Sequence, residues 1–115
     1  IVLGAPLYGY EWETTGTEPR SAVIPGSGQV ASNRRMENFV ASCATCSAGF
    51  DPEAKETYLI YKDQGTETFH QVFYPDKAAT EEKISLVKKF QISGLAFWAL
   101  GYDGATILEP LSSYR

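Results

Sequence analysis

Aromatic side chains near the start of the chain have the spacing of a binding surface. Tyr8, Tyr10 and Trp12 alternate with Gly9 and Glu11, and alternate residues of an extended segment point to the same side. Three rings on one side could stack on a sugar or a base. Packing of two of these rings beneath the following loop is an equally favoured alternative.

Trp98 is a further candidate for ligand contact. It belongs to the apolar run Gly94–Gly101, which is short and bounded by glycines. Such a run predicts a strand buried on both faces. An indole at the end of a parallel strand could form a wall for a flat ligand. A large aromatic residue in a strand is more often buried in the core, however.

The two cysteines and the histidine offer little other chemistry. Cys43 and Cys46 form a Cys-x-x-Cys pair, and His70 is the only histidine. A zinc site would need further ligands, so we expect no metal and no cofactor. The cysteines are then two unpaired small residues, a local disulfide or, as the least favoured alternative, a catalytic or metal-binding pair. His70 lies in a predicted strand, where packing or surface exposure is expected rather than catalysis.

Composition excludes several classes of protein. The 115 residues are 43% hydrophobic and 21% charged, as in an ordinary globular domain. A net charge of -4 without a basic cluster argues against nucleic acid and anionic membranes as partners. The chain starts inside an apolar strand without Met and is shorter than the roughly 200 residues of a complete (β/α)₈ barrel. We therefore expect a piece of a longer protein.

Periodicity and turn residues predict an α/β fold with an inserted α+β element. A helix that leads directly into a buried strand is typical of parallel strands. An antiparallel hairpin interrupts this frame. The predicted order is a strand in 1–3, a loop over 13–30, a helix over 31–40, hairpin strands 57–62 and 68–74, a helix over 81–90 and the strand 94–101.

Three segments together resemble the family 18 glycoside hydrolases. Ile1–Trp12 is similar to the seventh-strand motif of that family, with an aliphatic run before a Gly-x-Pro and a Tyr-Gly. Phe50–Lys55 resembles part of the small insertion between the seventh and eighth strands, and Gly94–Gly101 resembles the eighth strand. The segments occur in the order of the family. Residues 8–12 resemble bacterial chitinases and spore or cell-wall glucosaminidases more than animal members of the family.

The resemblance implies the C-terminal part of a (β/α)₈ barrel that cleaves β-1,4-linked N-acetylglucosamine polymers, chitin or peptidoglycan. This polysaccharide is the expected partner, and the parent protein is expected to be secreted or in the cell envelope. Residues 1–12 would form a barrel strand and cleft loop. Residues 13–76 would form the inserted subdomain, and 77–115 the last barrel helix and strand and the start of another helix.

The resemblance also implies which residues bind sugar. Trp98 would lie beneath the sugar at the cleavage subsite. Tyr8, Tyr10 and Trp12 would line the cleft, with Tyr10 standing where many relatives have Arg. One wall of the groove would come from the hairpin, through Tyr58, Tyr61, His70 and Tyr74.

The catalytic acid of the family is not expected in this chain. Relatives carry it in an Asp-x-x-Asp-x-Asp-x-Glu motif on the fourth strand, and the N-acetyl group of the substrate attacks the anomeric carbon. That motif does not occur here. Asp51 and Glu53 are interpreted as a turn, and Glu81 and Glu82 as a solvated first helical turn.

Three interpretations of the function therefore stay open. The chain could be part of a hydrolase and inactive alone, part of a lectin-like binding member whose acid is replaced, or only a scaffold. Exposed edges of strands 1–3 and 95–98 favour a homo-oligomer or a rearranged sheet for the isolated chain.

Overall fold

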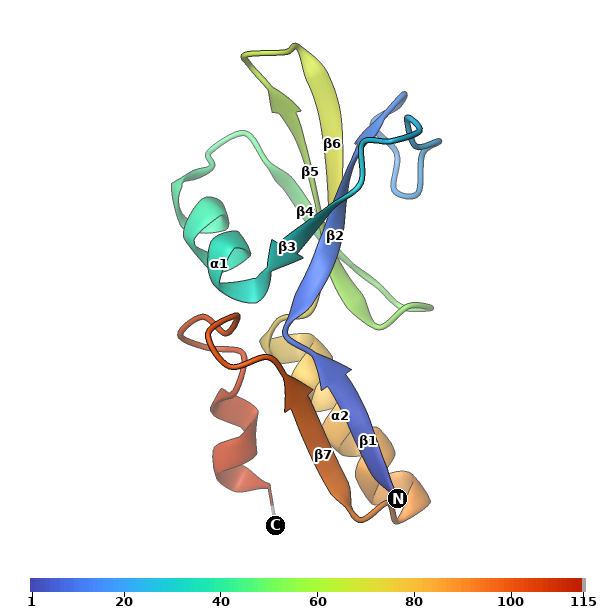
Figure 1. Ribbon diagram of the computed structural model, residues 1–115, viewed down its shortest axis with the longest axis vertical. Coiled ribbons are helices and arrows are strands. Elements are labelled where there is room, and N and C mark those ends of the chain that lie inside the picture. Colours follow the sequence, from blue (N-terminus) through green and yellow to red (C-terminus); the bar gives the residue numbers. More distant parts are fainter. Residues whose placement is uncertain (115) are drawn as a thin grey trace.

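The computed structural model describes residues 1–114 and contains a parallel and an antiparallel sheet. Strand β1 (Val2–Pro6) pairs in parallel with β7 (Gly94–Trp98), so that Pro6 lies opposite Trp98. Helix α2 (Lys77–Phe90) lies along this pair (Figure 1). The predicted α/β arrangement with parallel strands is therefore confirmed.

Strand β7 differs from its prediction in one respect. The apolar run predicts burial on both faces, and this is wrong, because Ala96 is exposed and Trp98 retains 71% of its accessible surface. Within residues 1–114, β1 is the only strand that pairs with β7. Association of isolated chains through this uncovered surface stays a prediction that sedimentation can test.

The second sheet has five antiparallel strands in the order β3-β2-β6-β5-β4. The β5–β6 hairpin confirms the predicted one. The edge strands β3 and β4 were not predicted, because their short sequences are rich in small and polar residues with weak strand preference. The bounds are Tyr8–Thr14 for β2, Gln29–Ser32 for β3, Ser47–Asp51 for β4, Glu56–Asp63 for β5 and Thr68–Tyr74 for β6.

Helix α1 (Asn33–Ser42) covers one face of the five-stranded sheet. The hydroxyl of Ser32 accepts a hydrogen bond from the backbone N–H of Arg35 at 3.1 Å and caps the helix. Met36 is buried in the main apolar core, which is completed by Ala31, Leu59, Val72 and Tyr74. These packing contacts fix α1 against the strands.

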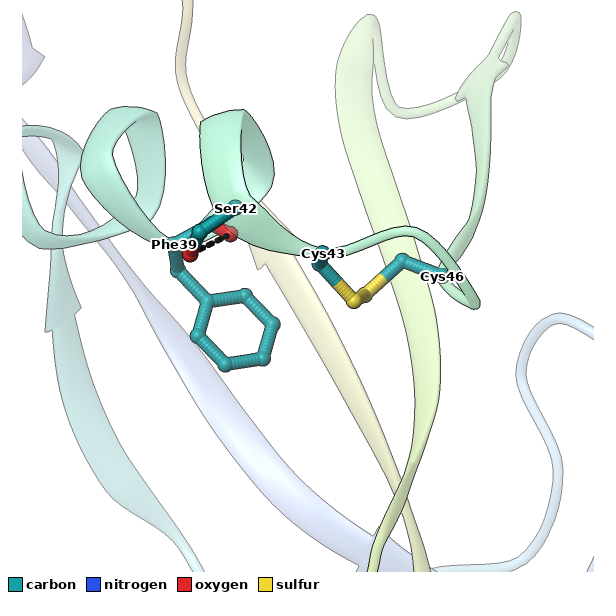
Figure 2. The surroundings of a disulfide bond; sticks show 4 residues. All are labelled: Phe39, Ser42, Cys43 and Cys46. Atoms are coloured by element: carbon teal, nitrogen blue, oxygen red, sulfur yellow. Dashed lines mark hydrogen bonds between the residues drawn. A yellow bond between two sulfur atoms is a disulfide. The ribbon is translucent and has the colours of Figure 1, made fainter.

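The two cysteines form a disulfide at the end of α1 (Figure 2). The Cα atoms of Cys43 and Cys46 lie 5.7 Å apart. Directly before Cys43, the hydroxyl of Ser42 donates a hydrogen bond to the carbonyl oxygen of Phe39 at 3.2 Å. Of the alternatives left open by the sequence, the structure contains the local disulfide.

A single residue, Leu7, separates β1 of the parallel sheet from β2 of the antiparallel sheet. Leu7 is completely buried. Its N–H donates to the carbonyl oxygen of Trp98 at 2.6 Å, and its own carbonyl accepts from the N–H of Asn33 at 2.9 Å. Both sheets are thus fixed to each other at this residue.

After β7 the chain forms a loop and then a short 3₁₀ helix, η1 (Glu109–Ser113). Ile107 is completely buried ahead of it, and Lys77 of α2 lies 3.4 Å from Glu109. Across residues 1–114, the helices lack the combined length and apolar character needed to cross a bilayer.

Candidate functional site

The aromatic residues of β2 form a continuous row on one face of the strand. The ring centroids of Tyr8 and Tyr10 lie 6.0 Å apart, and those of Tyr10 and Trp12 lie 5.9 Å apart. The predicted common side is therefore confirmed. The row continues beyond β2 to Tyr102, whose ring stands edge-on to Tyr8 at 6.0 Å.

Trp98 lies next to this row because β7 pairs with β1, and only Leu7 separates β1 from β2. Tyr8, Tyr10, Val30, Trp98 and Tyr102 line a hollow of about 240 Å³. The side chains of Trp98 and Tyr10 are 71% and 45% exposed, so their rings are accessible to a ligand. A second hollow of about 430 Å³ follows the uncovered face of β1 and β7 and shares Tyr8 and Trp98 with the first.

The hollow offers both flat faces and polar groups. Aromatic rings stack against apolar faces of a ligand, and a phenol hydroxyl both donates and accepts hydrogen bonds. The phenol hydroxyls of Tyr8, Tyr10 and Tyr102 are polar side-chain groups among the residues that line the hollow. This combination suits a flat, hydroxyl-rich ligand such as a sugar.

Trp12 lies outside the hollow, although it was predicted to line the cleft. Its indole packs over Gly28, where an added Cβ would lie 2.9 Å from Nε1 of Trp12. The loop that contains Gly28 therefore covers part of the ring. The alternative prediction was that two of the three rings pack beneath the following loop. This holds for Trp12 but not for Tyr10, which is 45% exposed.

A buried polar cluster lies on the opposite face of β2. Glu11 is only 2% exposed, and its carboxylate accepts hydrogen bonds from Arg35 at 2.7 Å, Tyr61 at 2.8 Å and Gln29 at 3.3 Å. Nδ1 of His70 lies 2.9 Å from the same carboxylate. The His70 ring also stacks on Tyr61 with 5.0 Å between centroids.

The surroundings of Glu11 favour its ionised form. Burial raises the pKa of Glu11, but hydrogen bonds from Arg35 and Tyr61 and the nearby charges of Arg35 and His70 outweigh it, so this pKa lies below its ordinary value. Burial and the hydrogen bond to Glu11 raise the pKa of Tyr61. A carboxylate enclosed by its own partners holds strands together rather than transferring protons to a ligand.

Comparison with known proteins identifies the family. The family model described as glycosyl hydrolases family 18 matches residues 1–103. The chain belongs to glycosyl hydrolases family 18.

The relatives similar to this chain include enzymes of Bacillus species. The cortical fragment-lytic enzyme of Bacillus subtilis (strain 168) is 30% identical over 104 residues, which are 88% of this chain and 22% of that protein. The structure of the spore cortex-lytic enzyme SleL from Bacillus megaterium QM B1551 matches with a TM-score of 0.77 and 25% identity, over 99% of this chain and 25% of that one.

A third similar protein is a family 18 N-acetylglucosaminidase from Paenibacillus barengoltzii. Its structure matches with a TM-score of 0.77 and 25% identity, over 100% of this chain and 33% of that one. The chain therefore spans between 22% and 33% of the length of these family 18 proteins.

Several residues predicted from the family 18 resemblance lie elsewhere. His70 and Tyr74 are 7% and 5% exposed, and Tyr61 bonds to Glu11. The prediction that they form a groove wall is wrong for these three residues, because their side chains face α1 and the core. The packing role predicted for His70 agrees with its burial.

Asp51 and Glu53 form the predicted turn rather than a catalytic pair. Oδ1 of Asp51 accepts from the N–H groups of Glu53 and Ala54 at 2.9 and 3.0 Å, and its other oxygen lies 2.6 Å from the Arg20 guanidinium. Among residues 1–114, no three His, Cys, Asp or Glu side chains gather as metal ligands.

Tyr102 and Val30 also line the hollow, but neither was predicted from the sequence to do so. Tyr102 follows Gly101, which adopts a left-handed backbone conformation at φ 96° and turns the chain after β7. The position of Tyr102, four residues after Trp98 and directly after a glycine turn, could have indicated that the two rings lie at the same end of β7. Val30 lies in the unpredicted strand β3.

Proposed function

We propose that this chain supplies part of the sugar-binding cleft of a glycosidase that cleaves β-1,4-linked N-acetylglucosamine polymers. Trp98 would lie under one sugar ring, and Tyr8 and Tyr10 would contact the sugar from the side of β2. Trp12 would support Tyr10 and contact ligand with the part of its ring that stays accessible. The observation that carries this proposal is the exposed Trp98 beside two tyrosines in a family 18 chain.

The proposed position in the whole protein is the end of a (β/α)₈ barrel. Strands β1 and β7 would be its seventh and eighth strands, and residues 13–76 the insertion between them. Support comes from the direct parallel register of β1 and β7 and from the match to family 18 structures over nearly all of this chain. Ligands of such barrels bind at the carboxyl ends of the strands, where Pro6 and Trp98 lie.

The proposed reaction is substrate-assisted hydrolysis with retention of configuration. An acid outside this chain would protonate the glycosidic oxygen, and the substrate's acetamide oxygen would attack the anomeric carbon. Trp98 would hold the sugar ring and its acetamide in the geometry that this attack needs. The isolated chain is therefore proposed to bind sugar without hydrolysing it.

We infer a cell-wall polymer as the natural substrate from the names of two similar proteins, a cortical fragment-lytic enzyme and a spore cortex-lytic enzyme. Chitin is the alternative, because another similar structure is that of a chitinase. Both polymers present the same N-acetylglucosamine unit, so soluble oligomers of this sugar are suitable probes for the hollow.

Calorimetric titration of the chain with tri-N-acetylchitotriose tests the proposal. We expect saturable binding that Trp98→Ala abolishes. Leu100→Ala is the matched control, because Leu100 is 89% exposed and lies outside the hollow. Equal binding by wild type and Trp98→Ala, or no binding by wild type, would contradict the proposal.

A non-catalytic, lectin-like protein is the second candidate. In such a protein the same aromatic hollow would bind the sugar, and the acid on the fourth strand would be replaced. Release of reducing ends from N-acetylglucosamine oligomers by the full-length protein separates the candidates, since a lectin would bind the oligomers and leave them intact.

A further inference from the structure

The loop that follows β7 is held by the first two turns of α1 (Figure 1). The backbone N–H of Arg34 donates to the carbonyl oxygen of Tyr102 at 2.8 Å. Nε of Arg34 donates to the carbonyl oxygen of Asp103 at 3.1 Å. The backbone of Tyr102 is thus fixed by a helix that lies some seventy residues earlier in the sequence.

Asn33 adds a buried connection to the same loop. Its side chain is completely buried, and Oδ1 accepts from the N–H of Gly104 at 2.7 Å while Nδ2 donates to the carbonyl oxygen of Pro75 at 2.9 Å. One amide therefore joins the loop after β7 to the end of β6.

Glu37 completes the attachment one turn further along α1. Its carboxylate accepts from the N–H of Ala105 at 2.7 Å, and from the N–H and hydroxyl of Thr106 at 3.2 and 2.6 Å. Hydrogen bonds to a charged acceptor are stronger than those between neutral groups. A Cβ at Gly104 would overlap the Glu37 carboxylate, so a larger residue here would displace that carboxylate from its hydrogen bonds.

We propose that Tyr102 is a sugar-contacting residue of the hollow and that Glu37 is its positioning residue. This inference rests on the proposed function. Tyr102 lines the hollow with Trp98 and is 40% exposed, and its ring stands edge-on to Tyr8 at an interplanar angle of 82°. Its ring and hydroxyl would contact the sugar bound over Trp98 from a second side.

The fixed loop explains how an exposed ring could contribute to affinity. Ordering a mobile loop and its side chains on binding has an entropic cost that reduces affinity. The hydrogen bonds that the loop makes with Asn33, Arg34 and Glu37 order it during folding, before any ligand binds. Glu37 does not line the hollow, so its influence on binding passes through residues 102–106.

A double-mutant cycle in calorimetric titrations with tri-N-acetylchitotriose tests this positioning. Tyr102→Ala and Glu37→Gln are each expected to weaken binding by about three- to tenfold, since one aromatic contact or one charged hydrogen bond has this magnitude. The double variant is expected to bind no more weakly than Tyr102→Ala. Glu81→Gln, which removes an exposed charge on α2, is the matched control and should bind like wild type.

Two results would overturn the inference while leaving the proposed function intact. One is wild-type affinity in Glu37→Gln and Tyr102→Ala alongside lost binding in Trp98→Ala. The other is full additivity of the two losses, which would mean that Glu37 acts independently of Tyr102. Equal affinity of wild type and Trp98→Ala for tri-N-acetylchitotriose would instead reject both the proposed function and this inference.

A second variant protects the test against simple unfolding. Thr106→Val removes one hydrogen bond to Glu37 and keeps the size of the side chain. It should weaken binding less than Glu37→Gln, and this loss should also vanish in the Tyr102→Ala background. Thermal melting of each variant identifies any that fail to fold, and Thr106→Val then takes the place of Glu37→Gln in the cycle.

Discussion

Nδ1 of His70 lies 2.9 Å from Oε2 of Glu11, on the face of β2 opposite the exposed ring of Tyr10. The same carboxylate binds Arg35 of α1 and Tyr61 of β5. One buried charge thus connects α1 with β2, β5 and β6. Because Glu11 is the neighbour of Tyr10 along β2, the cluster fixes the strand that presents the aromatic row.

Removal of the Glu11 carboxylate should destabilise the chain. Glu11→Ala leaves Arg35, Tyr61 and His70 without their shared partner. Breaking a buried charge pair costs roughly 3–5 kcal/mol, and we expect about 3 kcal/mol because the Arg35 side chain is 43% exposed. Urea unfolding gives the free energy, with Glu81→Ala as the control. A loss no larger than that of the control would show that the cluster contributes little.

Acid should weaken the same interaction. The pKa of Glu11 is lowered in the folded chain, so its ionised form stabilises the fold above the unfolded pKa of about 4.3. This contribution is lost as the pH falls from that value through the folded pKa. The stability of wild type should therefore decline more steeply than that of Glu11→Gln between about pH 5 and pH 3.

The pKa of Glu56 is shifted in the direction opposite to that of Glu11, so its effect on stability must be distinguished from that of Glu11. Burial raises the pKa of Glu56 despite the nearby charge of Lys83, so protonation of this carboxyl favours the folded chain as the pH falls. Glu56 is present in both wild type and Glu11→Gln, and its effect cancels in their difference. Parallel stability curves for the two proteins would exclude Glu11 as the group responsible.

Gly9 should tolerate no side chain. A Cβ at this position would overlap the carbonyl oxygen of Phe73 in β6, and backbone cannot move aside as a flexible side chain can. We expect Gly9→Ala to cost about 1–3 kcal/mol, as overpacking does. Gly4→Ala is the matched control, because no atom lies within 4 Å of its added Cβ. Equal melting temperatures for the two variants would refute the close approach of β2 and β6.

Reduction of the disulfide should lower stability by a modest amount. Cys43 and Cys46 close a very short loop, and the chain-entropy relation gives about 2 kcal/mol for a loop of this size. Urea unfolding with and without reductant measures this difference. Cys43→Ser with Cys46→Ser is the control and should not respond to reductant. A wild-type curve that reductant leaves unchanged would count against a stabilising disulfide.

Local patterns were sufficient to predict part of the fold. The β5–β6 hairpin was predicted from two runs of β-branched and aromatic residues around a Gly65 turn, where neighbours in sequence are also partners in space. The common side of Tyr8 and Tyr10 follows from strand geometry alone. Both predictions depend on interactions within a few residues.

The remaining features depend on contacts between distant segments. The burial predicted for β7 requires neighbours that its own apolar sequence does not specify. Glu11 resembles an exposed strand residue until Arg35, Tyr61 and His70 are placed around it. Tyr102 lines the hollow because hydrogen bonds from its loop to α1 hold the loop in place. The sequence of residues 99–106 does not indicate these contacts with α1.

The junction at Leu7 makes the length of the chain between the two sheets a determinant of the site. Side chains of a strand alternate between faces, so an insertion or deletion of one residue shifts every later residue to the other face. One extra residue after Pro6, if β1 kept its register, would turn Tyr8 and Tyr10 toward the α1 side of the sheet and Glu11 toward the hollow. Substitutions at Leu7 would alter packing, whereas a change in length would exchange an aromatic surface for a charged one.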